Sequence, residues 1–200
     1  MNNFQDIISF KALYNANRQC LKGKRTKKEA IDYQLNLGVN LTDLHYRLKY
    51  QKYRIEKYYC FMIHDLKERE IQAISYEDRI VQRAVCDGYL TPLLQRHLYF
   101  YNVACRKDKG TSLAMNYLKE SLQAMWVKYI NEFYAIKIDI KKFFDSMDHN
   151  IIKEKLKIII ADVFILQLLE TIIDSYHHEN QKGLPMGNQT SQSFCAFIFK

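Results

Sequence analysis

The segment Tyr134–Asn150 reads YAIKIDIKKFFDSMDHN, and it contains the features that decide the fold. Its first part is apolar, and the β-branched residues Ile136 and Ile138 favour a β-strand over about residues 133–139. The expected strand ends at Asp139. A carboxylate at the end of a buried strand is costly unless a cation neutralises it, and in catalytic sites that cation is usually a divalent metal. Asp139 is therefore a candidate metal ligand, with an ordinary turn aspartate as the alternative.

Two adjacent aromatic residues, Phe143 and Phe144, follow the expected strand. We expect their rings to form the floor of a pocket beside the metal. The sequence then predicts a helix from about His149 to residue 160 and another from about Asp162 to Tyr176, with Asp162 as the cap of the second.

The composition indicates a folded, basic protein. The 200 residues are 48% hydrophobic and fit one or two domains, and the low content of Pro and Gly argues against disorder. The net charge is +8 and 14% of the residues are aromatic, which suits a polyanion with stackable bases. A basic globular protein without a nucleic-acid partner is the alternative at this point.

Several classes of protein are disfavoured. The five cysteines are odd in number, scattered, and form no C-x-x-C motif, which argues against a disulfide framework and against zinc. The N-terminal sequence MNNFQDII does not resemble a secretory signal. The longest apolar run, residues 158–173, is interrupted by three polar residues and is too short for a membrane span. We expect a cytoplasmic protein with no membrane association.

The N-terminal residues are expected to form two helices, over residues 4–22 and 28–49. The basic segment between them contains Lys24 and Arg25, and such segments bind phosphate backbones electrostatically. A solvated loop with no ligand is the alternative.

Residues 53–74 are rich in Tyr and Ile and predict two antiparallel strands joined at about residues 64–68. Ser75 is expected to cap a helix that follows. Within that helix, Arg79 and Arg83 lie four residues apart on one face, where they contact template phosphates or serve a structural role.

A second basic stretch contains Arg106 and Lys109 and precedes Thr111, which is expected to cap a helix over residues 112–129. A helix N-terminus preceded by basic residues is a favourable anion site. The sequence GLPMGNQTSQ, residues 183–192, predicts a stiff loop, with a helix that begins at Ser191. A loop of this kind is able to lie beneath a base pair.

Four segments together resemble the reverse transcriptase family, in the order in which that family has them. DIKKFFDSMDH (residues 139–149) resembles the first palm motif, and LPMGNQTSQ (184–192) resembles the second. LKEREIQAIS (66–75) resembles the fingers hairpin, and DRIVQRAV (78–85) resembles a second fingers motif of bacterial reverse transcriptases. The resemblance spans roughly residues 10–200.

The branch most similar to this chain is that of the diversity-generating retroelements. The S-Q ending of the second palm motif and the ACRKDKGTSLA segment, residues 104–114, are the similar features. The chain departs from the usual patterns in two places. Met186 stands where the branch usually has Ile or Val and the wider family has Gln, and Leu66 replaces a proline before Lys67.

The resemblance implies an α+β fold, helix-rich with small antiparallel sheets, comprising the fingers and a partial palm of a right-hand polymerase. It implies an N-terminal helical extension over residues 1–50, fingers over 51–130 and a partial palm over 131–200. The family's Tyr-x-Asp-Asp hairpin does not occur in the 200 residues. We therefore expect the chain to be the N-terminal part of a longer enzyme and to be inactive in primer extension by itself.

The resemblance also implies roles for individual residues. Asp139 and the Ile140 carbonyl would ligate Mg²⁺, or Mn²⁺, and Phe144 would exclude a ribose 2′-hydroxyl. Lys67 and Arg69 would grip the nucleotide triphosphate. The other expected nucleotide contacts are Phe143, Met186 and Gly187. The expected nucleic-acid contacts are Lys24, Arg25, Arg79, Arg106, Lys109, Gly183, Pro185 and Ser191.

The implied activity is RNA-directed DNA polymerisation. The implied partners are an RNA template, a DNA or RNA primer, deoxynucleoside triphosphates and a small basic accessory protein. Two alternatives are open from the sequence. One is a non-catalytic RNA-binding fragment of a polymerase, and the other is an RNA-templated RNA polymerase.

Overall fold

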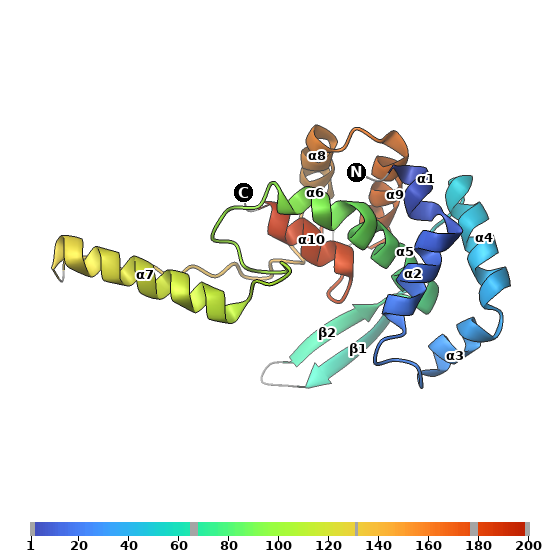
Figure 1. Ribbon diagram of the computed structural model, residues 1–200, viewed down its shortest axis with the longest axis horizontal. Helices are drawn as coiled ribbons and strands as arrows, with labels where there is room; N and C mark the ends of the chain where they lie inside the picture. Colours follow the sequence, from blue (N-terminus) through green and yellow to red (C-terminus); the bar gives the residue numbers. More distant parts are fainter. Residues whose placement is uncertain (1–2, 65–67, 131, 177–179, 199–200) are drawn as a thin grey trace.

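The computed structural model describes residues 3–64, 68–130, 132–176 and 180–198. Most of the helices pack into one body, from which a two-stranded hairpin and one long helix project (Figure 1). This architecture matches the expected α+β class, helix-rich with a small antiparallel sheet.

The first fifty residues form short helices in place of the two longer ones predicted from the sequence. Ser9 has extended backbone dihedrals, and its hydroxyl accepts a hydrogen bond from the Ala12 amide at 3.2 Å, so it ends one helix and caps the next. Asn36 interrupts the second predicted helix in the same way, although its side chain makes no capping bond. The helices are α1 (Phe4–Ile8), α2 (Phe10–Cys20), α3 (Lys28–Leu35) and α4 (Leu37–Lys49).

The predicted hairpin is confirmed. Strands β1 (Tyr59–His64) and β2 (Glu68–Ala73) are antiparallel, with Tyr59 opposite Ala73. The predicted cap of the following helix, α5 (Tyr76–Val85), is also confirmed, because the Ser75 hydroxyl accepts a hydrogen bond from the Asp78 amide at 3.1 Å.

The start of α5 is anchored by a buried polar network. The Tyr53 hydroxyl donates to Asp78 at 2.6 Å, and the Ser75 hydroxyl donates to the other oxygen of the same carboxylate at 2.6 Å. Burial raises the pKa of Tyr53 well above its usual value, and the Asp78 carboxylate adds to this effect, so the phenol stays protonated as a donor. The network ties the segment that leads into the hairpin to the helix that follows it.

Helix α5 forms the centre of the body. It continues through a π-helical turn, η1 (Cys86–Leu90), into α6 (Thr91–Gln95). Helix α2 packs against α5 on one side, and α1 and α4 pack on α2. The apolar residues of this continuous segment are buried in the core: Ile80, Val81, Ala84, Val85 and Leu90.

Three C-terminal helices complete the body: α8 (His149–Ile159), α9 (Val163–Asp174) and α10 (Gln189–Ile198). The Asp162 cap is confirmed, since its carboxylate accepts from the Phe164 and Ile165 amides at 3.0 and 3.2 Å. Helix α10 begins at Gln189, two residues before the predicted start at Ser191. It packs against α5, α6 and α8, which places the loop before it at the centre of the molecule.

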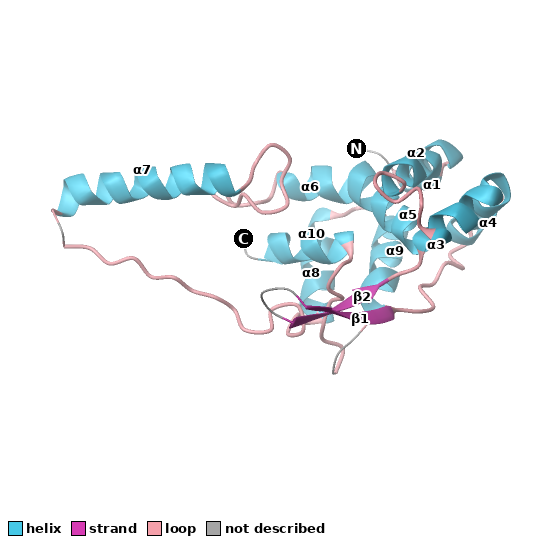
Figure 2. Cartoon of the chain, turned by 90° about the horizontal axis from the view of Figure 1, so that it is seen from below, coloured by secondary structure: helices cyan, strands magenta, loops and turns pink. Residues whose placement is uncertain are grey.

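Helix α7 (Thr111–Tyr129) extends away from the body, and the segment after it runs back towards the body as a loop (Figure 2). Its N-cap is Gly110, which makes no side-chain capping bond, so the predicted Thr111 cap is wrong by one residue. No residue of α7 is buried. Helix α7 therefore contributes little to the core.

The strand predicted over residues 133–139 is not formed. Described residues 132–140 are extended, and Ile136 and Ile138 are 85% and 82% exposed. A strand exists through hydrogen bonds to a neighbouring strand, and the described part of the chain supplies none for this segment. The alternation of apolar residues is present in the sequence, but the described residues contain no strand that pairs with this segment.

Among the described residues, no helix has both the length and the apolar character that crossing a lipid bilayer requires.

Candidate nucleotide and nucleic-acid site

The segments that resemble the two palm motifs meet in space. The Leu184 amide donates to the Phe144 carbonyl at 2.9 Å, and the Gly183 amide donates to the Met147 carbonyl at 2.8 Å. These bonds join residues that lie about forty positions apart in the sequence. The loop over residues 181–188, hereafter the glycine loop, is therefore held against the turn that contains Phe143 and Phe144.

His149 fastens the same loop from the side of α8. Its side chain is 2% exposed, its Nε2 lies 2.9 Å from the Gly183 carbonyl oxygen, and its Nδ1 lies 3.2 Å from Asp174. A carbonyl only accepts, so Nε2 carries the hydrogen and donates it. Lys153 binds the other oxygen of Asp174 at 2.6 Å, so a chain of polar contacts runs from the surface of α8 to the glycine loop.

The opposite side of the glycine loop is attached to β2 through Gln72. The Gln72 amide donates to the Met186 carbonyl at 3.2 Å, and the Gln72 side-chain oxygen accepts from the Met186 amide at 3.0 Å. The loop therefore lies between the hairpin and the first palm-like motif, in contact with both.

Gly187 lies where the glycine loop comes closest to β2. Its φ is +118°, and a Cβ added there would lie 3.3 Å from Ile71 Cγ2 and 3.6 Å from the Gln72 carbonyl oxygen. A side chain at this position would face both backbone strain and a close contact. The backbone of Gly187 is accordingly exposed at the surface beside the hairpin.

The predicted nucleotide contacts surround this junction. Phe143 and Phe144 are half-buried against the core, with ring centroids 5.8 Å apart in an edge-to-face arrangement. Met186 is half-buried in the loop, and Arg69 is exposed on β2 opposite Ile63. Lys67 lies outside the described residues.

The predicted metal ligands lie in the segment between α7 and the aromatic pair. Asp139 and Ile140 are exposed, in the extended segment that precedes the aromatic pair. Within the described ranges, no three His, Cys, Asp or Glu side chains gather closely enough to hold a metal ion. Asp148 is the N-cap of α8, where its carboxylate accepts a hydrogen bond from the Asn150 amide at 2.9 Å. The residues present do not amount to a two-metal site.

A basic surface adjoins the glycine loop. A cavity of about 580 Å³ between α2 and α5 is lined by the cations Arg18, Lys22, Arg25 and Arg83, with Asp87 as a counter-charge. A second cavity, of about 190 Å³, shares Lys22 and Arg83 with the first. It is also lined by Lys24, Arg79, Gly187 and Gln189. The basic loop after α2, the arginines of α5 and the glycine loop thus border two adjoining cavities, which together we call the basic groove.

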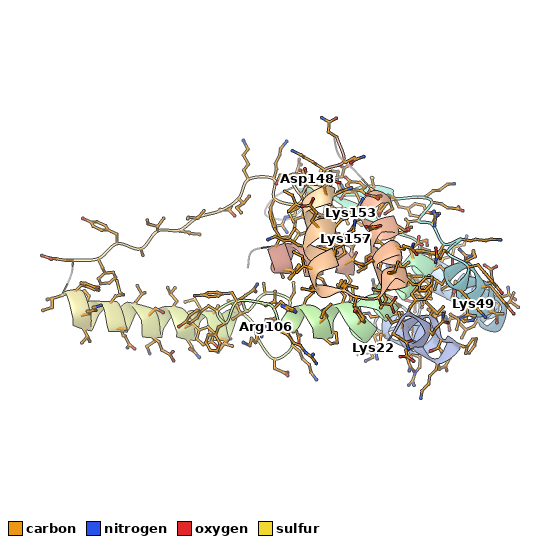
Figure 3. All side chains as sticks on the ribbon, turned by 90° about the horizontal axis from the view of Figure 1, so that it is seen from above. Lys22, Lys49, Arg106, Asp148, Lys153 and Lys157 are labelled. Atoms are coloured by element: carbon orange, nitrogen blue, oxygen red, sulfur yellow. The ribbon has the colours of Figure 1, made fainter. Side chains whose placement is uncertain are left out.

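Not every cation near the groove is available to a ligand. Arg79 binds the Ile74 carbonyl at 2.9 Å and forms an ion pair with Glu29 at 3.3 Å. Arg83 lies 3.6 Å from Asp87. Lys22, Lys24 and Arg25 are exposed. Lys22 is labelled in Figure 3, on the helical body.

The second basic stretch lies on the loop that leads to α7, where Arg106 is labelled (Figure 3). Its guanidinium donates to the carbonyls of Asn102 and Tyr99 at 3.1 and 3.4 Å, and therefore shapes this loop. Lys109 lies over the Phe100 ring, 5.4 Å from its centroid.

Three residues expected to bind nucleic acid are covered by protein. Gly183 and Pro185 are buried, and Ser191 is 1% exposed within α10. They support the glycine loop from inside, and we leave them out of the contact surface.

The sequence did not point to Gln72 or to His149, although both hold the glycine loop. Gln72 lies in a strand with mixed polar and apolar residues, and nothing in the sequence distinguishes it from its neighbours. Only the structure does so, because Gln72 is buried and 5% exposed. His149 was predicted only as a helix start. The available signal was a histidine directly after an aspartate that caps a helix. That signal does not show that the histidine binds the carbonyl of Gly183, which is distant in the sequence.

Comparison with solved structures finds several chains that share this fold, among them the two that follow. A chain of a partial Cas6-RT-Cas1–Cas2 complex and a chain of a Cas6-RT-Cas1–Cas2 complex each match with a TM-score of 0.59 and 20% sequence identity. The chain therefore shares its fold with part of each of these two matched chains. Each alignment covers 98% of this chain, which spans 33% of the first matched chain and 21% of the second. No family model matches the sequence, and no curated protein matches it.

Proposed function

We propose that the chain is the fingers and the first part of the palm of an RNA-directed DNA polymerase, of the diversity-generating retroelement type. In this proposal residues 1–50 are an N-terminal helical extension, 51–130 are fingers and 131–200 are a partial palm. The matched chains are much longer, so the complete reaction is proposed for a longer protein that contains this segment.

One observation supports this function above the others. The hydrogen bond from the Leu184 amide to the Phe144 carbonyl, at 2.9 Å, joins the two palm-like motifs, and Gln72 joins both to the hairpin. A nucleotide site in a polymerase of this kind requires these three segments to converge. Sequence order alone does not require them to meet.

The proposed nucleotide contacts follow from this convergence. Arg69 and Lys67 of the hairpin bind the triphosphate, and Phe143, Phe144, Met186 and Gly187 enclose the sugar and base. In this proposal Phe144 packs against the sugar and excludes a ribose 2′-hydroxyl by contact. Magnesium, with manganese as the alternative, stays a prediction for Asp139 and the Ile140 carbonyl.

The proposed template contact is the basic groove. Lys24 and Arg25 are exposed beside Lys22, and a phosphate backbone along the groove would reach Gly187 at its other end. Arg106 and Lys109 would extend the basic surface towards α7. A primer strand and a small basic accessory protein are also proposed partners, and the described surface does not assign a contact to either.

The groove is tested by RNA binding at increasing salt concentration. Replacement of Lys22, Lys24 and Arg25 by alanine should weaken binding and reduce the salt slope by about 2, since each phosphate contact on a single strand contributes about 0.7. A control removes two cations away from the groove, Lys153 and Lys157, which lie on α8 and pair with Asp174 and Glu170 (Figure 3). Equal losses per removed cation in the two variants would show that net charge, and not the groove, binds RNA.

The nucleotide site is tested separately. With a template–primer present, a fluorescent deoxynucleoside triphosphate should bind more tightly than the ribonucleotide, and Phe144→Val should reduce that difference. RNA binding without any nucleotide binding would support the non-catalytic RNA-binding alternative. An unchanged preference in Phe144→Val would remove Phe144 from the proposed sugar contact.

A further inference from the structure

The contact between β2 and the glycine loop has the form of one step of a β-ladder. Gln72 donates its backbone N–H to the Met186 carbonyl at 3.2 Å. In an ordinary ladder a backbone carbonyl would receive the Met186 N–H, but here the Gln72 side-chain oxygen accepts it at 3.0 Å. Gln72 of the hairpin therefore satisfies both the N–H and the carbonyl of Met186 in the loop. Gln72 is itself buried, with 5% exposure.

This contact fixes which face of β2 lies beside the loop. Ile71, the neighbour of Gln72, is the residue that a Cβ on Gly187 would meet at 3.3 Å. Arg69 lies two residues before Ile71, so it is on the same face of the strand and about 7 Å further along it. The exposed Arg69 side chain and the exposed Gly187 backbone are consequently neighbours on one surface.

We propose that Gln72 is a positioning residue for the nucleotide, acting through its bond to Met186. It sets the register between the hairpin and the glycine loop, so that Arg69 and the Gly187 backbone face one triphosphate-bearing ligand. Gln72 itself does not touch the ligand. This inference rests on the proposed function, because that function supplies the ligand.

The chemistry of the contact predicts which substitutions preserve it. The recorded side-chain bond uses only the acceptor oxygen of Gln72. Glutamate retains an acceptor at the same distance along the side chain, whereas methionine has a similar length and no comparable acceptor. Gln72→Glu should therefore retain the register, and Gln72→Met should leave the Met186 N–H without its partner.

The chain provides a matched control for Gln72→Met. Gln82 in α5 is 1% exposed, and neither polar atom of its side chain has a hydrogen-bond partner among the described residues. Gln82→Met removes the same amide from a comparably buried position without breaking a recorded bond. Effects shared by both variants reflect loss of a buried glutamine in general.

Hydrogen exchange tests the register directly. Protection of the Met186 amide should fall about tenfold in Gln72→Met, the loss expected for one hydrogen bond, and should be retained in Gln72→Glu and Gln82→Met. Protection of the Ile63 and Phe61 amides in β1 should not change, because the ladder between β1 and β2 is intact. Unchanged Met186 protection in Gln72→Met would overturn the inference.

Nucleotide binding tests the positioning role. With a template–primer present, Gln72→Met should weaken binding of a fluorescent deoxynucleoside triphosphate about tenfold, while Gln72→Glu restores it. The Arg69→Ala and Gln72→Met changes should be less than additive in combination, because Gln72 acts through the placement of Arg69. Equal nucleotide affinity in wild type and Gln72→Met, with lost Met186 protection, would show a structural role only and would overturn the inference.

The two proposals fail in different ways. A wild-type chain that binds no nucleotide contradicts the proposed function at this site, and the positioning role fails with it. A wild-type chain that binds nucleotide, together with a Gln72→Met variant that binds it equally well, contradicts only the inference about Gln72.

Discussion

Replacement of Gly187 by alanine should destabilise the protein more than the same change at Gly23 or Gly38. Two separate costs arise from the structure. The φ of +118° lies in a region that residues with a side chain rarely adopt, which costs about 1–3 kcal/mol. The new Cβ would also lie 3.3 Å from Ile71 Cγ2, so the side chain of Ile71 must move.

Two other glycines separate these costs. Gly23 has a φ of +69° with nothing within 4 Å of an added Cβ, so Gly23→Ala carries backbone strain of about 1 kcal/mol without a contact. Gly38 lies in α4 with open space around an added Cβ. Gly38→Ala should stabilise the protein by about 0.5–1 kcal/mol, because alanine is the better helix former.

Urea denaturation of the wild type and the three variants measures these differences. We expect the free energy of unfolding to fall by about 2–3 kcal/mol in Gly187→Ala, since strain and contact add. It should fall by about 1 kcal/mol in Gly23→Ala and rise in Gly38→Ala. If Gly187→Ala and Gly23→Ala are equal, the close approach of the glycine loop to β2 is not present in solution, and the reasoning about the hairpin junction is refuted.

Three further predictions concern buried polar groups. The Tyr76 hydroxyl donates a hydrogen bond to Asn17 at 2.8 Å, and burial raises the pKa of this phenol to about 12. The stability that the neutral hydroxyl supplies is therefore complete below the unfolded-state pKa of about 10. It is lost as the pH rises to about 12. The difference in unfolding free energy between wild type and Tyr76→Phe, from urea titrations at pH 9 to 12, should therefore shrink by up to about 2–3 kcal/mol; a constant difference would contradict the burial. Asp162→Ala should lower the free energy of unfolding by about 1–2 kcal/mol, because the carboxylate caps α9 and also accepts a hydrogen bond from the Phe4 amide at 2.9 Å. Asp148→Ala loses one recorded capping bond and should therefore lower it by less in the same assay. His149→Phe should cost about 2–4 kcal/mol, because it leaves the buried Gly183 carbonyl without its 2.9 Å donor, and near wild-type stability would show that the imidazole does not hold the loop.

Local signals in the sequence were sufficient for much of the secondary structure. The Ser75 and Asp162 caps depend on bonds within three residues, and the hairpin depends on strands that are adjacent in sequence. The helix breaks at Ser9 and Asn36 were missed because both residues are compatible with a helix interior. Serine and asparagine favour caps and turns over helix interiors, but the local sequence does not show which alternative wins.

The strand predicted over residues 133–139 failed for a different reason. Alternation of apolar residues reports the two faces of a strand, whereas formation of the strand depends on a neighbour that is distant in sequence. Helix α7 shows the same limitation. Its apolar residues Met115, Leu118, Leu122, Met125 and Tyr129 recur at helical spacing, yet all of them are more than a third exposed. A periodic pattern predicts which face would be buried, and not what buries it.

The departure at Met186 has a structural counterpart across the junction. The wider family that the chain resembles has a glutamine at this position of the loop and the most similar branch has Ile or Val, whereas the chain has methionine. The glycine loop is nevertheless placed by backbone groups, with the carbonyls of Phe144 and Met147 on one side and both backbone groups of Met186 on the other. Gln72 supplies an amide oxygen to that same residue from the hairpin. Because the register is set by the backbone of residue 186 and a glutamine opposite it, the side chain at 186 is free to differ from the family pattern without loss of the junction.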